Sequence, residues 1–397
     1  MLQPHVLQVL QQSVPILSEQ GESIVQCFYG ILFERYPELK NVFNLTNQRN
    51  GNQAKALAEA IFAYASLAEH PEQLGPTVQR IAHKHVSLAI QPAQYAMVGE
   101  ALLMALSEKL NVPMEHDIIQ AWGEAYGELA EIFIAQEQDL NQANADKIGG
   151  WQGFRPFVIS RIVDETPQIK SLYLQPADGK PLATFQAGQY VSVKLTDVPD
   201  HPYDEMRQYS LSDQPGLPHY RISVKAEPGN PQGLVSNHLH THAKPGDEIL
   251  LSAPCGDFVL PNQVEREVVL ISAGVGITPM MSMLKTALQT EDRQHAIRFI
   301  HCAQDRQQHC FADELSQLQA QQAFHYFQVF SNSTEGDYQG RIDQAALDTF
   351  LSENPADFYF CGPFPFMVAL KHVLVARAVP EERIHYEVFG PTLSLGD

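Results

Sequence analysis

The 397-residue chain has little positive charge. Its 26 lysines and arginines face 46 aspartates and glutamates, which gives a formal net charge of −20 at pH 7. A nucleic-acid backbone or an anionic membrane surface would be repelled by this field, so neither is an expected partner. Hydrophobic residues make up 44% of the chain and charged residues 18%, and such values are ordinary for a globular protein.

Cysteine is scarce, and its spacing matches no common motif. Five cysteines are scattered along the chain without a CxxC pair: Cys27, Cys255, Cys302, Cys310 and Cys361. This pattern argues against a disulfide framework, a zinc ribbon and a haem that is attached covalently through a CxxCH motif.

Long apolar runs are also missing. The N-terminal MLQPHVLQVLQQSV carries glutamines and a proline where a signal peptide would need a basic start and an apolar stretch. Residues 268–284 are uncharged, but Gly274, Gly276, Thr278 and Pro279 interrupt them, and a membrane helix needs about 20 apolar residues. We therefore expect a cytoplasmic protein without integral membrane association, and we expect a monomer.

The first part of the chain has a helical pattern. Over residues 1–143, apolar side chains recur at three- and four-residue steps, which predicts an all-α domain. The expected helices cover residues 20–36, 50–68, 71–85, from Pro92 onward, and 116–141. Residues 144–153, NADKIGGWQG, are polar and glycine-rich and are interpreted as a linker.

Two further domains are predicted after the linker. Residues 154–262 contain short alternating runs, such as FVISRIVD and HYRISVKAE, which predict an antiparallel β-barrel. Residues 263–397 contain near-continuous apolar runs, such as VVLISAG and FYFCG, separated by helical stretches. Buried strands of a parallel α/β sheet have this pattern. The expected fold class is therefore multidomain: all-α, then an antiparallel β-barrel, then an α/β domain with a parallel sheet.

The first chemical motif is Arg207-Gln208-Tyr209-Ser210 in a predicted barrel strand. Because side chains alternate along a strand, Arg207 and Tyr209 share one face and Ser210 lies on the other. A guanidinium can pair with a pyrophosphate, and an aromatic ring can cover an isoalloxazine. Downstream, Gly233 to Ser236 opens a helix whose N–H groups and dipole favour phosphate. Taken alone, RQYS is more often an ordinary barrel strand.

The second motif is Gly274-Val275-Gly276-Ile277-Thr278-Pro279, directly after the apolar strand 268–272. A glycine-rich turn that leads into a helix suits a dinucleotide pyrophosphate. The motif lacks the third glycine of GxGxxG, so by itself it could be a structural turn. Cys361-Gly362-Pro363 follows another apolar strand, and we expect this turn to border the same crevice.

In this order, RQYS, GLVS, GVGITP, CGP and the terminal Glu387-Val388-Phe389-Gly390-Pro391 resemble the ferredoxin–NADP reductase family, from about Gly150 to the C-terminus. The resemblance implies that one FAD is bound by Tyr190, Arg207, Gln208, Tyr209 and Ser210, with Gly233 and Ser236 near its pyrophosphate. It also implies that residues 274–279, 361–363 and 387–391 border the nicotinamide dinucleotide, with Phe389 and Glu387 near the flavin ring. The choice between NADH and NADPH stays open, because Asp305 suits a ribose hydroxyl and Arg306 a 2′-phosphate.

A reductase needs an electron acceptor, and the all-α domain is the candidate. A haem pocket requires an imidazole to ligate the iron and an apolar cage to hold the macrocycle. His83 and His85 lie near the end of a predicted helix. Composition does not choose between them, and a histidine at such a place is more often a surface residue.

The order Tyr29, Phe43, Gln53, Leu57, His85, Tyr95, Glu137, with the stretches IAHKH and QYAMVGEALL, resembles the globin half of the flavohaemoglobins. The resemblance now covers essentially the whole chain. It implies one haem b per chain, with His85 as the iron ligand and Tyr95 and Glu137 behind it. Tyr29 and Gln53 would hydrogen-bond O2 on the distal face, Phe43 would pack on the haem, and Leu57 would shape ligand entry. Lys84 would face the flavin or a haem propionate, although a solvated lysine is nearly as reasonable.

The resemblance implies a nitric oxide dioxygenase. Electrons would pass from NAD(P)H to FAD to haem, and haem-bound O2 would oxidise NO to nitrate. FAD suits this path because it accepts two electrons together and releases them singly. Two alternatives remain: a general NAD(P)H-dependent reductase of ferric chelates, quinones or cytochromes, and a haem-based gas sensor or oxygen store. The expected partners are small molecules, namely O2, NO and NAD(P)H.

Overall fold

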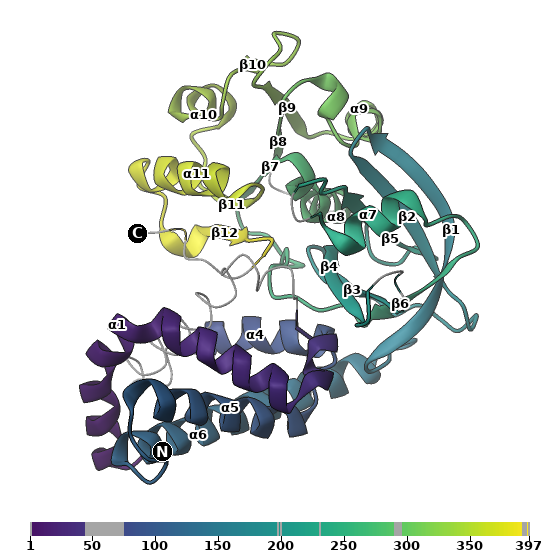
Figure 1. The fold of residues 1–397 in the computed structure, drawn as a ribbon. Helices are drawn as coiled ribbons and strands as arrows, with labels where there is room; N and C mark the ends of the chain where they lie inside the picture. The colour runs from purple at the N-terminus through teal and green to yellow at the C-terminus, as the bar shows by residue number, and fades with distance from the viewer. Residues whose placement is uncertain are drawn as a thin grey trace. The chain divides into compact units, whose positions relative to one another are not determined.

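The computed structural model describes residues 2–43, 75–196, 198, 201–229, 232–289, 296–390 and 395 (Figure 1). The chain forms two compact units. The first comprises Met1–Phe154 with Lys194–Arg207, and the second comprises Arg155–Val193 with Gln208–Asp397.

The first unit contains long helices. Their bounds are α1 Pro4–Arg35, α4 Gly75–Ser87, α5 Pro92–Leu110 and α6 Asp117–Ala145, with a 3-10 helix at Pro37–Asn41. The predicted end of the first helix before Pro37 and the start at Pro92 are confirmed. The prediction that the first helix starts near Gln20 is wrong, because α1 begins at Pro4 and continues through Pro15. The helix predicted over residues 50–68 lies outside the described residues.

Apolar faces of these helices form one core. Leu10 and Phe28 of α1, Leu106 of α5 and Trp122 of α6 are almost fully buried. The Trp122 indole N–H donates to the Ser13 hydroxyl at 3.0 Å, which satisfies the polar end of a buried ring. This packing explains why the helix extends past Pro15: one lost backbone hydrogen bond is offset by the burial of Leu10 before the proline and of Ile24 and Phe28 after it.

The strands that follow the helices along the chain form an antiparallel sheet. Its strands are β1 Phe154–Thr166, β2 Ile169–Pro176, β3 Tyr190–Leu195, β4 Glu205–Ser210, β5 Tyr220–Lys225 and β6 Glu248–Ser252. They are ordered β4-β3-β6-β1-β2-β5. The two end strands meet, because Leu211, directly after β4, forms an antiparallel bridge with Ile222 of β5. The prediction of an antiparallel barrel is confirmed, although β6 was not among the predicted strands.

A parallel sheet follows. Its strands are β7 Glu267–Ala273, β8 Ile297–Ala303, β9 His325–Phe330, β10 Tyr338–Gln339, β11 Ala356–Cys361 and β12 Ile384–Glu387. Their order is β10-β9-β8-β7-β11-β12. The associated helices are α8 Ile277–Leu288, α9 Ala312–Gln321, α10 Gln344–Phe350 and α11 Phe364–Ala376, and the barrel segment adds α7 Leu234–Thr241. The predicted α/β pattern is confirmed.

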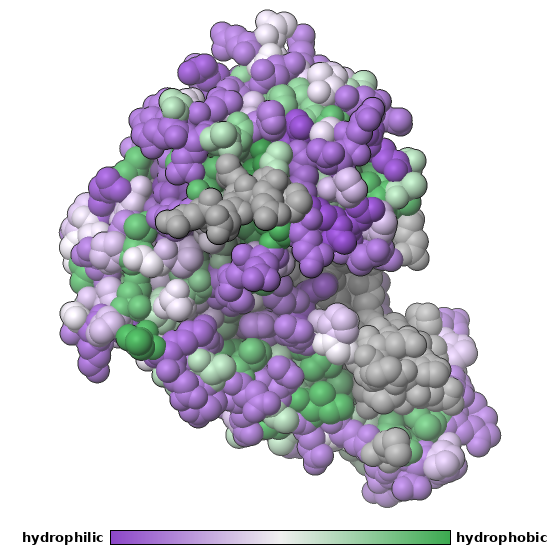
Figure 2. Space-filling view, turned by 180° about the vertical axis from the view of Figure 1, so that it is seen from behind, coloured by the Kyte–Doolittle hydropathy of each residue, from purple (hydrophilic) through white to green (hydrophobic). Residues whose placement is uncertain are grey.

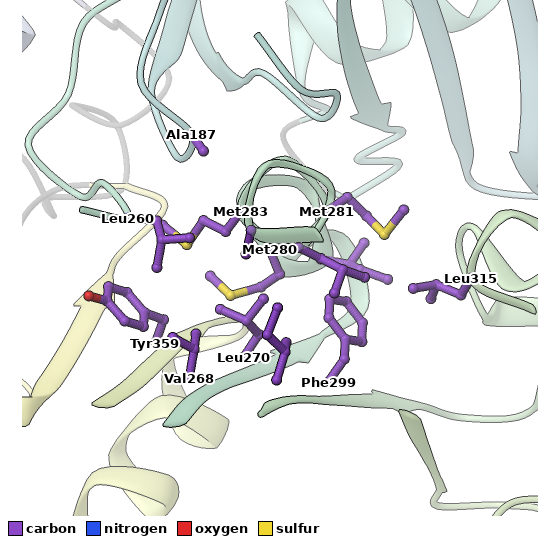
Figure 3. Packing of buried hydrophobic residues seen from close by; sticks show 14 of the residues in the cluster. Ala187, Leu260, Val268, Leu270, Met280, Met281, Met283, Phe299, Leu315 and Tyr359 are labelled. Atoms are coloured by element: carbon purple, nitrogen blue, oxygen red, sulfur yellow. The ribbon is translucent and has the colours of Figure 1, made fainter. Parts of the chain in front are cut away.

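Helix α8 is packed into the core of the second unit. Ten of its residues are buried, including Met280, Met281 and Met283. Figure 3 shows Met280 pointing toward Leu270 of β7, while Met283 lies on the side of Leu260. Flexible methionine side chains fill irregular space between a helix and its neighbours. Packing on several sides therefore fixes the position of α8 and of the turn that precedes it.

The exterior matches the charge composition. Hydrophilic residues dominate the face drawn in Figure 2, and apolar residues there form small, separated groups. Within the described ranges, no helix combines the length and the hydropathy that crossing a membrane requires.

Candidate functional site

The helical unit brings together three residues that the sequence predicts to act as a group. His85 lies in the last turn of α4, Tyr95 in the first turn of α5, and Glu137 on α6. The His85 Nδ1 atom lies 2.8 Å from Glu137 Oε1 and 2.9 Å from the Tyr95 hydroxyl oxygen. The Tyr95 hydroxyl also donates a short hydrogen bond to the same Glu137 oxygen. One carboxylate thus accepts from both partners.

This cluster has a defined proton arrangement. Glu137 is only 4% exposed, so its carboxylate needs partners. Burial and the hydrogen bond to Glu137 raise the pKa of Tyr95, which keeps its hydroxyl protonated and able to donate. The His85 Nδ1 then carries the proton that faces Glu137, and its Nε2 atom is left as the basic nitrogen. Among the described residues, no protein atom hydrogen-bonds that Nε2.

A close helix approach supports the cluster. A Cβ added at Gly99 of α5 would lie 2.5 Å from a ring carbon of Tyr126 on α6, so only glycine allows this contact. The Tyr126 hydroxyl donates to the main-chain carbonyl of Tyr95 at 2.7 Å. Neither residue was predicted from the sequence. The only available signal was a glycine inside a long helix, where it costs stability unless packing requires it.

Aromatic residues form the other predicted part of this site. The Tyr29 ring lies 5.8 Å from that of Phe33 and 5.9 Å from that of Phe43, measured between centroids. Burial raises the pKa of Tyr29, so its hydroxyl stays neutral and can donate. Burial also lowers the pKa of Lys84, beside His85. Gln53 and Leu57, predicted for the same pocket, lie outside the described residues.

These side chains fit a haem. His85 would hold the iron through Nε2, because its Nδ1 is hydrogen-bonded to Glu137 and the ring orientation is thereby fixed. His83, the other candidate, lies two residues before His85 on α4. Phe33 and Phe43 would supply apolar surface, and Tyr29 an uncharged donor.

In the barrel, the RQYS motif occupies the end of β4 as predicted. Arg207, Gln208 and Tyr209 are partly exposed, whereas Ser210 is 5% exposed. Burial therefore does not alternate along β4. The Arg207 guanidinium pairs at 2.7 Å with Glu205 two residues earlier. A pyrophosphate would therefore have to share this guanidinium with a carboxylate.

Tyr190, at the start of β3, lies next to Cys255. Their main chains exchange two hydrogen bonds, at 2.8 and 2.9 Å, and the Tyr190 ring covers Gly256. Cys255 is 1% exposed, so its thiol is buried. The sequence did not show that Cys255 neighbours a predicted flavin residue.

Gly233 is the N-cap of α7, as predicted for a helix opening at GLVS. A Cβ at Gly233 would lie 2.6 Å from the Ser236 hydroxyl and 2.9 Å from Glu227 Cβ. The turn therefore has room for main chain only. This is the close approach that a phosphate-binding turn at a helix N-terminus needs.

The nucleotide motifs converge at the carboxyl edge of the parallel sheet. Strand β7 ends at Ala273, residues 274–276 form a 3-10 turn, and α8 begins at Ile277. A Cβ at Gly276 would overlap the main-chain carbonyl of Cys361 and lie 2.6 Å from the Gly362 nitrogen. The two predicted turns are thus packed directly against each other.

The C-terminal motif joins the same edge. Cys361 of β11 is in register with Ser272 of β7 on one side and Glu387 of β12 on the other. Phe389 follows with 45% of its surface exposed, which is unusual for a large apolar side chain. Pro391 lies outside the described residues. After β8, the Asp305 carboxylate accepts hydrogen bonds from the backbone N–H groups of Gln307 and Gln308.

These elements define a class of protein: a globin fused to a nucleotide-binding oxidoreductase. Residues 26–133 match the Globin family, and residues 270–372 match the oxidoreductase NAD-binding domain. The flavohemoprotein of Halalkalibacterium halodurans is 45% identical over 98% of this chain and 97% of its own length. That of Bacillus subtilis is 42% identical over 100% of this chain and 99% of its own. The chain therefore belongs to the flavohaemoprotein family.

Solved structures agree with this assignment. The flavohemoglobin of Malassezia yamatoensis, solved with bound FAD and heme, aligns with a TM-score of 0.87 at 27% identity, over 98% of this chain and 100% of its own. The FAD/NAD-binding domain of the Vibrio cholerae nitric oxide dioxygenase aligns with a TM-score of 0.55 at 41% identity, over 60% of this chain and 99% of its own. The three-part fold class is thus confirmed.

Proposed function

We propose that this oxidoreductase is an NAD(P)H-dependent nitric oxide dioxygenase that converts NO and O2 to nitrate. The family gives the chain haem, FAD and NAD(P)H as its cofactors. The observation that carries the proposal is the contact of His85 with the buried Glu137. A carboxylate that hydrogen-bonds an iron-ligating imidazole would make that ligand more electron-donating, and an oxygen store does not need this.

In the helical unit, the residues of the His85 cluster and Tyr29 would have separate roles. His85 would offer Nε2 to the iron, Glu137 would hold the Nδ1 proton, and Tyr95 would fix the carboxylate by its own hydrogen bond. Tyr29 would donate its hydroxyl to a ligand bound at the haem, because its raised pKa keeps it protonated. The haem supplies O2 binding and one-electron chemistry when bound.

In the reductase, FAD would convert the two-electron delivery of NAD(P)H into single electrons. Tyr190, Gln208, Tyr209 and Ser210 would hold the flavin, and Arg207 its pyrophosphate. Gly233 and Ser236 would place helix N–H groups near that pyrophosphate. Residues 274–279 and 361–363 would receive the nicotinamide dinucleotide, and Glu387 and Phe389 would lie where its ring enters.

The test measures NO on an electrode in air-saturated buffer, with holoprotein and NADH. We expect oxygen-dependent NO loss with nitrate as the product. Steady NADH oxidation without NO loss would support a general reductase instead, and no turnover of either would support a sensor or store.

The Tyr29→Phe variant sharpens this test, because it removes one hydroxyl and keeps the ring. We expect slower NO consumption and unchanged reduction of FAD by NADH. If Tyr29→Phe also stopped flavin reduction, the proposed division of tasks between the two halves would be wrong.

A further inference from the structure

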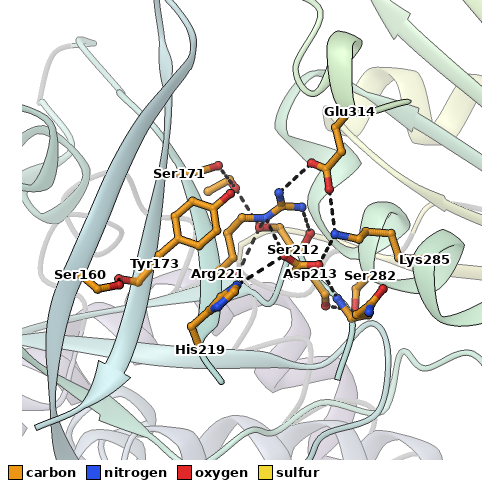
Figure 4. A network of polar contacts seen from close by, with 12 residues as sticks. Ser160, Ser171, Tyr173, Ser212, Asp213, His219, Arg221, Ser282, Lys285 and Glu314 are labelled. Carbon is orange, nitrogen blue, oxygen red and sulfur yellow. Dashed lines mark hydrogen bonds and ion pairs between the residues drawn. The ribbon is translucent and has the colours of Figure 1, made fainter. Parts of the chain in front are cut away.

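A closed ring of charges lies between the barrel and the α/β sheet, within the second compact unit (Figure 4). Arg221 binds Glu314 at 2.7 Å, and Glu314 binds Lys285 at 2.8 Å. Lys285 forms a short ion pair with Asp213, and Asp213 lies 3.8 Å from the Arg221 guanidinium. Positive and negative groups alternate around the ring.

The ring is buried and balanced. The side chains of Arg221 and Asp213 are 2% and 7% exposed, and those of Lys285 and Glu314 are 15% and 27% exposed. Burial alone would raise the pKa of Asp213, but Arg221 and Lys285 hold it below its usual value. Two cations and two anions then leave no net charge. An ion-pair set of this kind tolerates few geometries, because a lost partner leaves a buried charge uncompensated.

The ring connects the two halves of the reductase. Asp213 follows the RQYS motif by three residues, and Arg221 belongs to β5 of the barrel. Lys285 belongs to α8, the helix that starts at the GVGITP turn, and Glu314 belongs to α9. The Ser282 hydroxyl of α8 also donates to the Asp213 carbonyl at 2.8 Å.

The barrel side of the ring is itself fixed. The Arg221 Nε–H donates to the Ser212 hydroxyl at 3.2 Å, and Nη2 donates a short hydrogen bond to the Ser212 carbonyl. The guanidinium carbon lies 4.6 Å from the centroid of the Phe311 ring. His219, which faces Asp213 at 3.7 Å, completes the surroundings shown in Figure 4. Movement of α8 and α9 against Asp213 and β5 would therefore break several bonds at once.

We propose that the ring of Asp213, Arg221, Lys285 and Glu314 positions the nucleotide helix against the flavin strand for hydride transfer. This inference rests on the proposed reduction of FAD by NAD(P)H. The four side chains are positioning residues, because they act through Ser210 at the end of β4 and through the turn before α8. A displacement of about 1 Å at the reacting atoms can slow a reaction by about 100-fold.

The test severs the ring without leaving a net charge. The double variant Lys285→Met/Glu314→Gln removes one cation and one anion from the α/β side and leaves Arg221 with Asp213 in the barrel. The matched control is Arg298→Met/Glu267→Gln. It removes a pair at 2.5 Å that lies wholly within the parallel sheet and is more buried than Lys285 and Glu314, with exposures of 14% and 3%.

Anaerobic stopped-flow mixing with NADH gives the rate of flavin reduction at saturation and the half-saturating NADH concentration. For the ring variant, we expect FAD content and half-saturation near those of the unmodified protein, and a saturating rate at least tenfold lower. The control should keep its rate within about twofold. If the ring variant loses FAD, the variant Lys285→Arg is measured in the same way. It keeps the positive charge but changes its position, and we expect its saturating rate of flavin reduction to be severalfold lower than that of the unmodified protein.

Three results would overturn the inference. The first is an unchanged saturating rate in the ring variant, or in Lys285→Arg if that variant is used instead. The second is equal slowing of the ring variant and the control, and the third is a change in the half-saturating NADH concentration alone. The proposed function fails separately, since it would be contradicted if NADH and NADPH did not reduce the flavin of the unmodified protein.

Discussion

Replacement of Gly99 by alanine tests how closely α5 and α6 must approach to hold the His85 cluster. An added Cβ would lie 2.5 and 2.8 Å from two ring carbons of Tyr126. This is about 1 Å less than the separation at which carbon atoms attract each other. Overpacking of a well-packed core costs about 1–3 kcal/mol. Gly127, on α6, is the matched control, because nothing lies within 4 Å of its added Cβ.

Both substitutions gain about 1 kcal/mol from helix propensity, so this contribution cancels when the two variants are compared. We expect Gly127→Ala to be more stable than the unmodified protein, and Gly99→Ala to be about 1–3 kcal/mol less stable than Gly127→Ala. Each kcal/mol corresponds to about 2–4 °C in the unfolding midpoint of a domain of this size. Soret absorbance of the holoprotein during heating follows the haem domain separately from the reductase.

The same substitution should disturb the site. Tyr126 holds the carbonyl of Tyr95, so a displaced Tyr126 ring would move the hydroxyl that donates to Glu137. We expect a changed Soret spectrum in Gly99→Ala and an unchanged one in Gly127→Ala. Equal unfolding midpoints for the two variants would refute the close approach of these helices.

Three further predictions follow from other contacts. Glu137→Gln removes the charge behind His85 and should slow NO consumption by about 10- to 100-fold with haem content kept; an unchanged rate on the NO electrode would contradict its role. Gly276→Ala places a methyl group in the main chain of Cys361, so half-saturating NADH should rise at least tenfold while flavin absorbance shows FAD retained. Burial lowers the pKa of His309 to about 4, below the 6.5 of a free histidine. The unfolded chain therefore binds this proton first, so the stability contributed by neutral His309 is present above about pH 6.5 and lost as the pH falls toward 4. In urea unfolding followed by FAD fluorescence, His309→Gln should reduce this pH dependence by about 3 kcal/mol, and an equally steep profile would argue against it.

Local patterns in the sequence predicted many of the helices and strands, since each depends on a run of neighbouring residues. The continuous apolar strand β7 and the helix start at Pro92 are examples. Short elements such as β6 were not predicted, because five residues carry too little pattern. Helix α11 was not predicted either; it is apolar around most of its circumference and so lacks the amphipathic spacing that marks a helix.

The candidate site was predicted mainly through family resemblance. The structure adds the contacts between residues that lie far apart in the sequence. Glu137 lies 52 residues after His85, and no spacing rule brings these two side chains together. Gly276 and Cys361 meet only because parallel strands end at one sheet edge. Arg221 had one local signal, a charge within the buried strand β5, which implies a partner. Its partners could not be identified before the fold was known.

Burial of the cysteine thiols affects how readily oxidants and nitrosating agents modify this protein. The five cysteines all lie in the described part of the chain, and none of them forms a disulfide there. Burial raises the pKa of Cys302 to about 12, and it raises the pKa of Cys310 and Cys361 well above the usual value. Oxidants and nitrosating agents attack the thiolate, which these three residues hardly form near neutral pH. A catalyst proposed to turn over NO and O2 thus keeps these three thiols in the form that those reagents damage least.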